Sequence, residues 1–289
     1  MPSGIIIIDK PEGWTSQDVA AKLRGVFHER RVGHGGTLDP MATGVLPIFI
    51  GRATRGVEFF ESAEKEYVAG LKLGMETNTQ DTTGEVLNKK PVSVTRAQLE
   101  AVLLQFLGPQ EQLPPMYSAV KIGGKKLYEL ARQGKTVERK PRPIEILELE
   151  LLDGEGDEYR IRVRCSKGTY VRTLCHDIGQ ALGCGGCMSS LRRTKAGCYD
   201  LSQSISMETL LQQEDPCSLL LPVDSLFAHL PAHTVGEKQL KAVYNGAAVK
   251  ASQLPDGSYR VYAPDGSFLL LGEAKSGMLR TIKSFFEVK

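Results

Sequence analysis

The sequence lacks the motifs that hold the common organic cofactors and catalytic zinc. It contains no Gly-x-x-x-x-Gly-Lys-Ser/Thr phosphate loop, no Gly-x-Gly-x-x-Gly turn and no His-Glu-x-x-His pair. Interpretation as a nucleotide-cofactor enzyme or as a zinc hydrolase therefore loses support. We expect no cofactor and no metal.

Long apolar runs are also missing. The run from Ile5 to Ile8 is far too short to cross a bilayer, and no basic leader precedes it. With 289 residues, 41% of them apolar, the chain is long enough to bury a substantial core. We expect a soluble, cytoplasmic protein that does not associate with membranes.

Cysteine is confined to the second half of the chain, unlike the disulfide framework of a small secreted domain. We expect reduced thiols. Cys184-Gly-Gly-Cys187 has the spacing of half a zinc knuckle or of a redox pair, but no second Cys-x-x-Cys or His-x-x-x-His follows. We therefore interpret Cys184-Gly-Gly-Cys187 as small residues in a turn rather than as a metal or redox site.

The net charge is only +2, but its distribution is uneven. Residues 114–143 carry eight basic side chains against two acidic ones, which leaves the rest of the chain net acidic. Such a patch can contact phosphates and release counterions, and the alternative is an ordinary solvated loop. The eight basic residues are Lys121, Lys125, Lys126, Arg132, Lys135, Arg139, Lys140 and Arg142.

Hydrophobic periodicity predicts a strand and then a helix at the start of the chain. Ile5–Ile8 is typical of a buried strand, and Ser16 is expected to cap the helix that follows. Its apolar face would be Val19, Leu23, Val26 and Phe27. After it, Gly33–Pro40 is dense in glycine and is expected to be a shaped loop, a common place for functional residues.

Further along, the patterns predict strands at 45–50 and 66–73 and a helix capped by Thr95 and Gln98. A hairpin is expected from 144–152 and 159–166, because the second segment alternates apolar residues with arginines. The helix after Thr169 has its apolar stripe at Val171, Leu174, Ile178 and Leu182. Arg172 lies off that stripe, so its guanidinium is free to point at something specific.

The polar segment around residues 220–230, with Pro222 and Pro231 near its ends, suggests a domain boundary. The remainder predicts one helix at 237–244 and strands at 259–263, 268–273 and 278–286, with a Pro-Asp-Gly turn between the first two. We expect a catalytic domain at 1–224, including the basic insertion at about 114–143, and a small β-rich domain at 225–289.

Local rules leave the candidate catalytic residues open. Asp39 before Pro40 fits a helix N-cap with proline at the first helical position, or a catalytic acid. His34 fits a turn histidine or a general base. Tyr67 fits an ordinary strand aromatic.

Several motifs along the chain, taken in their order, resemble those of the bacterial tRNA pseudouridine-55 synthases of the TruB type. This resemblance favours catalytic or binding roles for Asp39, His34 and Tyr67. The match covers residues 4–195, and the C-terminal part resembles a PUA-type RNA-binding domain. The matching motifs are Lys10-Pro11-x-Gly13-x-Thr15-Ser16, Gly33-His34-Gly35-Gly36-Thr37-Leu38-Asp39-Pro40, Lys65-x-Tyr67, Gly74-x-x-Thr77-x-Thr79-x-Asp81-x-x-Gly84, Pro114-Pro115-x-Tyr117-Ser118-Ala119, Lys167-Gly168-Thr169-Tyr170-Val171-Arg172 and Leu191-Arg192-Arg193-Thr194.

The resemblance implies an α+β fold with a mixed, largely antiparallel central sheet flanked by helices and a small PUA-like domain. It implies an enzyme that isomerises uridine 55 in the T loop of tRNA without a cofactor. Asp39 would be the nucleophile, or the base of an elimination route. Arg172 would be its charge partner, and a cation within a few Å lowers a carboxylate pKa by ~1 to 3 units.

The resemblance also implies roles in binding the flipped nucleotide. Flipping costs roughly a few kcal/mol, which stacking on Tyr67 would nearly offset at ~1 to 3 kcal/mol. Residues implied around the nucleotide are His34, Tyr170 and Leu191, with Lys10, Thr37 and Asp81 at the edge of the same site. Cys187 and Met188 depart from the family pattern, which expects a histidine or an aromatic there.

The partner implied is the T arm of tRNA, gripped by the basic insertion, with the enzyme acting as a monomer and without guide RNA. Two alternatives remain. One is an inactive RNA-binding or RNA-folding protein, for which Asp39, Tyr67 and Arg172 would be dispensable. The other is a guide-RNA-dependent synthase, which would not be expected to keep the insertion.

Overall fold

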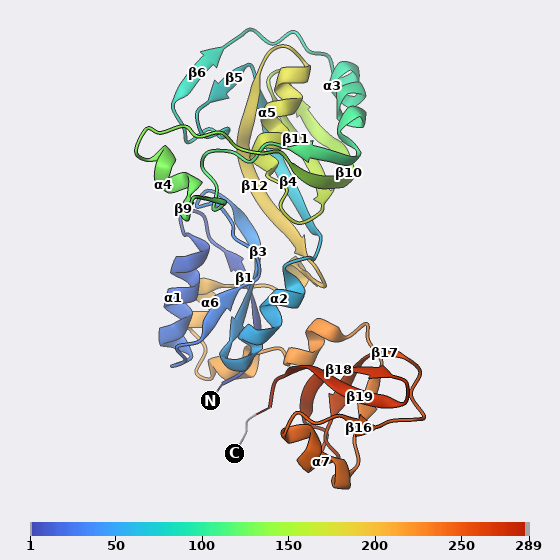
Figure 1. The fold of residues 1–289 in the computed structure, drawn as a ribbon. Helices are drawn as coiled ribbons and strands as arrows, with labels where there is room; N and C mark the ends of the chain where they lie inside the picture. The colour runs from blue at the N-terminus through green and yellow to red at the C-terminus, as the bar shows by residue number, and fades with distance from the viewer. Residues whose placement is uncertain (1, 287–289) are drawn as a thin grey trace.

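A ten-stranded sheet forms the larger part of the molecule in this computed structural model, which describes residues 2–286 (Figure 1). The strands follow the order β14-β1-β3-β12-β4-β11-β10-β7, with β2 paired to β3 and β13 to β12. They are β1 (Gly4–Lys10), β2 (Val32–His34), β3 (Thr43–Ile50), β4 (Lys65–Leu73), β7 (Gly108–Gln112), β10 (Arg142–Glu155), β11 (Glu158–Cys165), β12 (Gly186–Ala196), β13 (Tyr199–Asp200) and β14 (Ile205–Ser206). The β1–β14 and β3–β12 pairs are parallel and the others antiparallel, which confirms a mixed, largely antiparallel sheet.

Helices flank this sheet, and short elements decorate its connections. The α-helices are α1 (Ser16–Val26), α2 (Val57–Phe60), α3 (Arg96–Leu103), α4 (Leu127–Ala131), α5 (Val171–Ala181) and α6 (Met207–Leu211). Short 3₁₀ turns are η1 (Gly51–Gly56), η2 (Leu104–Phe106), η3 (Leu201–Gln203), η4 (Pro216–Leu219) and η5 (Val223–Phe227). Two hairpins stand apart from the sheet, β5 (Met75–Thr77) with β6 (Val86–Lys89) and β8 (Lys121–Ile122) with β9 (Lys125–Lys126).

The isoleucine run of β1 is buried because both faces of this strand are covered. Ile6 and Ile8 pack in one core with Val19 and Leu23 of α1. Ile5 and Ile7 face a second core that includes residues of α2 and η5. Side chains of a strand alternate between its faces, so a strand covered on both sides requires apolar residues at every position.

The N-terminus of α1 differs from the prediction. Thr15, not Ser16, is the N-cap, because its side chain accepts from the amide of Asp18 while Asp18 bonds back to Thr15. Ser16 is the first helical residue and is buried. Its hydroxyl accepts from the amide of Leu38 at 2.8 Å, which fixes α1 to the Gly33–Pro40 loop.

The helix-cap interpretation of Asp39 is wrong, because no helix follows it. Pro40 and Met41 form a turn closed by a hydrogen bond from the amide of Ala42 to the carbonyl of Asp39 at 3.0 Å. Proline presets the backbone angle that such a turn needs at its second position. β3 then begins at Thr43.

The other predicted strands and helices of the first 200 residues are confirmed, whereas the predicted loop at Gly33–Pro40 starts later, because Gly33 and His34 pair with β3 as part of β2. Thr95 and Gln98 form a capping box on α3, and β10 and β11 form the expected hairpin. On β11 the apolar side chains are buried, whereas Arg160 and Arg162 pair with acidic residues of β10 on the open face. Arg172, in the first turn of α5, is buried although it lies off the apolar stripe.

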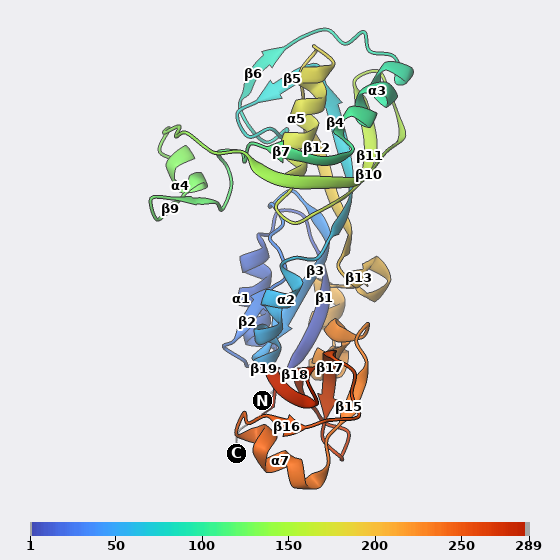
Figure 2. The same cartoon turned by 45° about the vertical axis from the view of Figure 1, so that its right-hand side comes forward.

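A second, five-stranded sheet lies at one end of the molecule, beside the end of β3 that leads into η1, and both views agree on this placement (Figures 1 and 2). Its order is β15-β17-β18-β19-β16, and it packs its own core. The elements are β15 (Ala232–Thr234), α7 (Glu237–Tyr244), β16 (Val249–Lys250), β17 (Gly257–Tyr262), β18 (Phe268–Lys275) and β19 (Met278–Ser284). The predicted β-rich C-terminal part is confirmed. The predicted domain boundary between residues 224 and 225 falls inside η5 and stays a prediction.

Candidate active site

Asp39 and Arg172 meet at the centre of the large sheet, near the start of β3. Arg172 Nε lies 2.9 Å from Asp39 Oδ2, and its Nη2 donates to Oδ1 at 3.3 Å. The Arg172 side chain is 6% exposed and that of Asp39 is 35% exposed. The two-pronged contact therefore fixes the carboxylate while leaving one side of it accessible to a ligand.

Arg172 also joins the other segments around Asp39. Its Nη1 donates to the carbonyl of Thr79 at 3.0 Å and its Nη2 to that of Tyr117 at 2.8 Å. Asp81 lies farther away, with its Oδ2 at 3.6 Å from Nη1. A single guanidinium thus orients the carboxylate, the Asp81 loop and the start of the basic insertion.

The environment of Asp39 shifts its proton affinity. Burial raises the pKa of the Asp39 carboxyl above its usual range, Arg172 opposes that shift, and the nearby Asp81 carboxylate adds to it. The net shift is upward, whereas the ion pair alone was expected to lower this pKa. The effect of burial on the pKa of Asp39 is therefore larger than that of Arg172, whose charge also interacts with Asp81.

Asp81 is held within its own loop. Its Oδ1 accepts from the hydroxyl of Thr79 at 2.8 Å and from the amide and hydroxyl of Thr83 at 3.0 and 2.6 Å. Met188 of β12 binds the main chain on both sides of it, with its amide donating to Gln80 O at 3.0 Å and its carbonyl accepting from Thr82 N at 2.9 Å. These bonds use only backbone atoms, so the departure from the family pattern at this position leaves the loop in place.

Lys10 supports the turn that carries Asp39. Its ammonium is fully buried and donates to the carbonyls of Pro11, Trp14 and Pro40 at 2.8, 2.6 and 3.2 Å. An ammonium has three donors, so these bonds use all of them. Burial lowers the pKa of Lys10 to about 8. Lys10 therefore ties the main chain around Pro11 and Trp14 to the turn at Pro40.

Tyr67 lies on β4, between Val163 of β11 and Arg193 of β12. It is 8% exposed, and burial raises the pKa of its hydroxyl. The phenol is therefore neutral near pH 7, and its hydroxyl lies within reach of the Arg193 guanidinium and the charge of Asp39.

Arg193 belongs to the same cluster and was not among the predicted site residues. It is 1% exposed, and its guanidinium donates to the carbonyls of Val45 at 2.7 Å and Gly36 at 3.1 Å. Within the described part of the chain it forms no ion pair. The alternation of a strand offers a signal that could have found it, because Arg193 lies two residues after Leu191 and so on the same, inward face.

The close approach of β3 and β12 at Arg193 depends on Gly44. Its φ is +99°, and a Cβ at this position would lie 2.2 Å from the carbonyl oxygen of Arg193. A side chain of any size would separate the two strands. Gly44 thus allows the segment with Asp39 and the segment with Arg193 to meet.

Comparison with known proteins places the chain in a family. Residues 24–171 match the TruB family pseudouridylate synthase (N terminal domain), and residues 172–228 match the tRNA pseudouridylate synthase B C-terminal domain. The chain belongs to the TruB family. The tRNA pseudouridine synthase B of Stutzerimonas stutzeri is 48% identical over 94% of this chain and 91% of the relative, and that of Syntrophomonas wolfei is 45% identical over 94% of each.

Solved structures agree on the fold. A chain of an H/ACA RNP bound to a substrate RNA containing 2′-deoxyuridine has a TM-score of 0.74 at 26% identity, covering 98% of this chain and 85% of that one. A chain of a Cbf5-Nop10-Gar1 complex has the same TM-score at 29% identity, with the same coverage. This TruB-family chain therefore has the pseudouridine synthase fold that was predicted for it.

The remaining predicted site residues of this TruB-family chain surround the cluster with less defined roles. His34 ends β2, its Nδ1 is buried with no hydrogen-bond partner among residues 2–286, and burial lowers its pKa. Thr37 is exposed in the loop, and Leu191 is buried on β12. The main chain of Tyr170 is fixed by Gln112, which accepts from its amide at 2.7 Å and donates to its carbonyl at 3.1 Å.

The basic insertion begins at the site and then turns outward. Six of its eight cations are exposed, and none of the eight forms an ion pair with any described residue. The side chains of Lys126 and Arg132 lie over the ring of Tyr128, at 5.3 and 5.4 Å from its centroid. The insertion therefore starts beside Arg172, through Tyr117, and carries its positive charge outward from there.

Among residues 2–286 no group of His, Cys, Asp or Glu is arranged to hold a metal ion. Cys184 and Cys187 are both buried, and burial raises the pKa of the Cys187 thiol to about 11. Over the same residues, no helix combines the length and apolarity needed to span a membrane.

Proposed function

We propose that this chain is a tRNA pseudouridine synthase that isomerises uridine 55 in the T loop, with Asp39 as its essential carboxylate and no cofactor. The observation that carries this proposal is the Asp39–Arg172 pair, which holds a partly exposed carboxylate whose charge acts on the hydroxyl of the buried Tyr67. The names of the TruB-family relatives support the tRNA substrate.

The chemistry requires no external group. The bond between the sugar C1′ and the uracil N1 breaks, the base turns, a C1′–C5 bond forms, and the proton on C5 is replaced by one on N1. As a nucleophile Asp39 attacks C1′, and in an elimination route it takes a proton from the sugar. Both routes need the ionised carboxylate, and Arg172 favours that form.

The base must leave its stack to reach Asp39. We assign the stacking face to Tyr67 and the walls of the pocket to Tyr170 and Leu191, with His34 against the RNA backbone. Thr37 and Asp81 shape the rim, and Lys10 holds the turn. Stacking on an aromatic ring is worth ~1 to 3 kcal/mol, comparable with the roughly few kcal/mol lost on flipping.

RNA affinity is assigned mainly to the insertion at 114–143. Its exposed cations suit the phosphates of the T arm, which position the RNA without reading its sequence. We further propose that residues 1–224 form the catalytic domain and 225–289 a PUA-like RNA-binding domain. The enzyme acts as a monomer in the cytoplasm.

The similarity to H/ACA and Cbf5 structures gives a specific alternative, a synthase directed by a guide RNA. The exposed basic insertion favours the stand-alone enzyme, because direct contact with the T arm makes a guide unnecessary. An inactive RNA-binding protein would gain nothing from a paired Asp39.

One experiment separates these functions. The purified protein is incubated with an unmodified tRNA transcript, without cofactor or guide RNA, and pseudouridine is mapped. We expect product at uridine 55 from the intact protein and none from Asp39→Asn, which keeps the shape of the side chain. Absence of product from the intact protein contradicts the stand-alone enzyme, and full activity of the variant contradicts the role of Asp39.

A further inference from the structure

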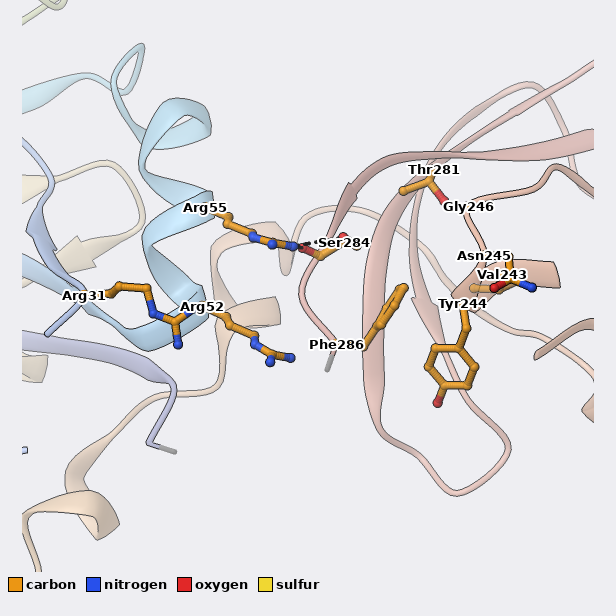
Figure 3. Close-up of a pocket in the computed structure, with 10 residues that line it drawn as sticks. All are labelled: Arg31, Arg52, Arg55, Val243, Tyr244, Asn245, Gly246, Thr281, Ser284 and Phe286. Atoms are coloured by element: carbon orange, nitrogen blue, oxygen red, sulfur yellow. Dashed lines mark hydrogen bonds between the residues drawn. The ribbon is translucent and has the colours of Figure 1, made fainter. Parts of the chain in front are cut away.

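A second basic site lies away from Asp39, in a cleft of about 500 Å³ between the large sheet and the C-terminal sheet. Figure 3 shows Arg52 and Arg55 of η1, with Arg31, reaching from one side, and Tyr244 and Phe286 on the other. None of these residues belongs to the site proposed for the isomerisation.

The cleft has the charge of an anion site. None of the described residues that line it is acidic. Arg31 shares its charge with Glu29, whose Oε1 lies 3.3 Å from its Nε. Arg55 Nη1 donates to Ser284 O and Oγ at 3.0 and 3.1 Å, which joins the two walls. Guanidinium groups match the geometry of phosphate oxygens, so the cleft suits a phosphate group.

The opposite wall offers an aromatic surface. Tyr244 is 39% exposed, and its ring stands edge-to-face with Phe286 at a centroid distance of 4.9 Å. An exposed ring held in place beside arginines is how proteins bind unpaired nucleotides, because every base has a face that can stack. A paired helix does not present such a face to a protein.

The position of the cleft separates it from the T arm. The eight residues of β3 run from the turn that carries Asp39 to η1, which corresponds to a distance on the order of 25 Å. In Figure 1 the basic insertion, with α4 and β9, lies near the opposite end of β3 from the C-terminal sheet. An RNA held by both features must reach along the whole length of β3.

We propose that this cleft binds an unpaired nucleotide of the RNA substrate outside the T arm, with its phosphate at Arg52 and Arg55 and its base on Tyr244. The inference rests on the proposed tRNA substrate and adds a second point of contact to it. A free phosphate or a double-stranded segment would not need the aromatic wall.

The test compares binding of a whole unmodified tRNA transcript with that of its T-arm stem-loop. Arg52→Glu should weaken whole-tRNA affinity by about 10-fold or more, since a charge-assisted contact is lost. The slope of log affinity against log salt should fall by about 1. Affinity for the stem-loop and its turnover should not change, which also shows that the variant folds. Arg280→Glu, at an exposed position of β19, is the matched charge control.

Tyr244→Ala tests the aromatic wall independently. With the intact protein, a single-strand-specific nuclease should find an unpaired nucleotide outside the T arm protected, and Tyr244→Ala should remove that protection. No such protection by the intact protein, or equal weakening of stem-loop and whole tRNA by Arg52→Glu, overturns the inference.

Turnover of the stem-loop tests the proposed enzyme activity separately. An active protein whose whole-tRNA affinity is unchanged by Arg52→Glu overturns the cleft alone. An inactive protein whose whole-tRNA affinity falls as described supports the cleft and contradicts the activity.

Discussion

Replacing Arg172 by methionine should move the acid limit of catalysis upward. Arg172 contacts Asp39 at 2.9 and 3.3 Å, and an opposite charge at such a distance lowers a carboxylate pKa by ~1 to 3 units. Because 35% of the Asp39 side chain is exposed, we take the lower end of that range. The variant should therefore raise the pKa of Asp39 by about one further unit, worth ~1.4 kcal/mol.

The direction follows from the ionised form that the reaction needs. The pKa of Asp39 is already raised by burial, so single-turnover rates should fall as the pH drops through a value above the usual range of aspartate. Arg172→Met should shift this limb upward by about one pH unit. Arg172→Lys keeps the charge but not the two-pronged contact and should shift it less.

The assay is the pH dependence of pseudouridine formation on a tRNA transcript under single-turnover conditions. Arg96→Met, which removes an exposed arginine paired with Glu100 on α3, is the matched control and should leave the profile unchanged. The methionine variant should also unfold more easily, since the partly buried Asp39 carboxylate is left without its partner. An unmoved acid limb in a folded Arg172→Met protein would refute this account of the site.

Three further changes test neighbouring parts of the site. Tyr67→Ala should reduce turnover far more than tRNA affinity, because most affinity comes from the phosphate contacts; equal losses in kinetic and binding assays would contradict this. Gly44→Ala should destabilise the fold, since the added Cβ would lie 2.2 Å from Arg193 O at a φ of +99°; an unchanged melting temperature would argue against the tight β3–β12 approach. Lys10, with a folded pKa of about 8 against an ordinary 10.5, binds fewer protons in the folded than in the unfolded chain between these values, so its contribution to the free energy of unfolding should rise with pH across that window. Denaturation of intact protein and Lys10→Met at pH 7.5 and 10 should show this divergence, and parallel curves would exclude it.

Among the described elements, periodicity predicted eight of the nineteen strands and four of the seven α-helices, those with continuous apolar faces, and it missed β12 of the large sheet. Local sequence alone contains the alternation from Tyr159 to Cys165 and the apolar stripe from Val171 to Leu182. The strand β11 and the helix α5 form there as expected. The isoleucine run of β1 predicted a buried strand. It did not predict that two different hydrophobic cores cover the two faces of that strand.

The features that local rules missed depend on distant segments. Thr15 and Ser16 are equivalent as caps by composition, and the choice between them follows from the bond of Ser16 to Leu38. Asp39 before Pro40 fits a helix or a turn equally well until β3 pairs behind it. The burial of Arg193 depends on the carbonyls of Gly36 and Val45, about 150 residues away. Motif resemblance, rather than periodicity, singled out Asp39 together with Arg172.

The place of β12 in the large sheet has a consequence for the growing polypeptide. This strand lies between β3 and β4, yet the chain reaches it only at residues 186–196. During synthesis, β3 and β4 therefore keep unpaired edges until β12 has left the ribosome and can pair with both of them. Such long-range pairing slows folding and leaves strand edges exposed meanwhile. A nascent chain shorter than about 196 residues holds Asp39 but lacks the strand that completes its surroundings, so chemical competence arises abruptly rather than gradually as translation proceeds.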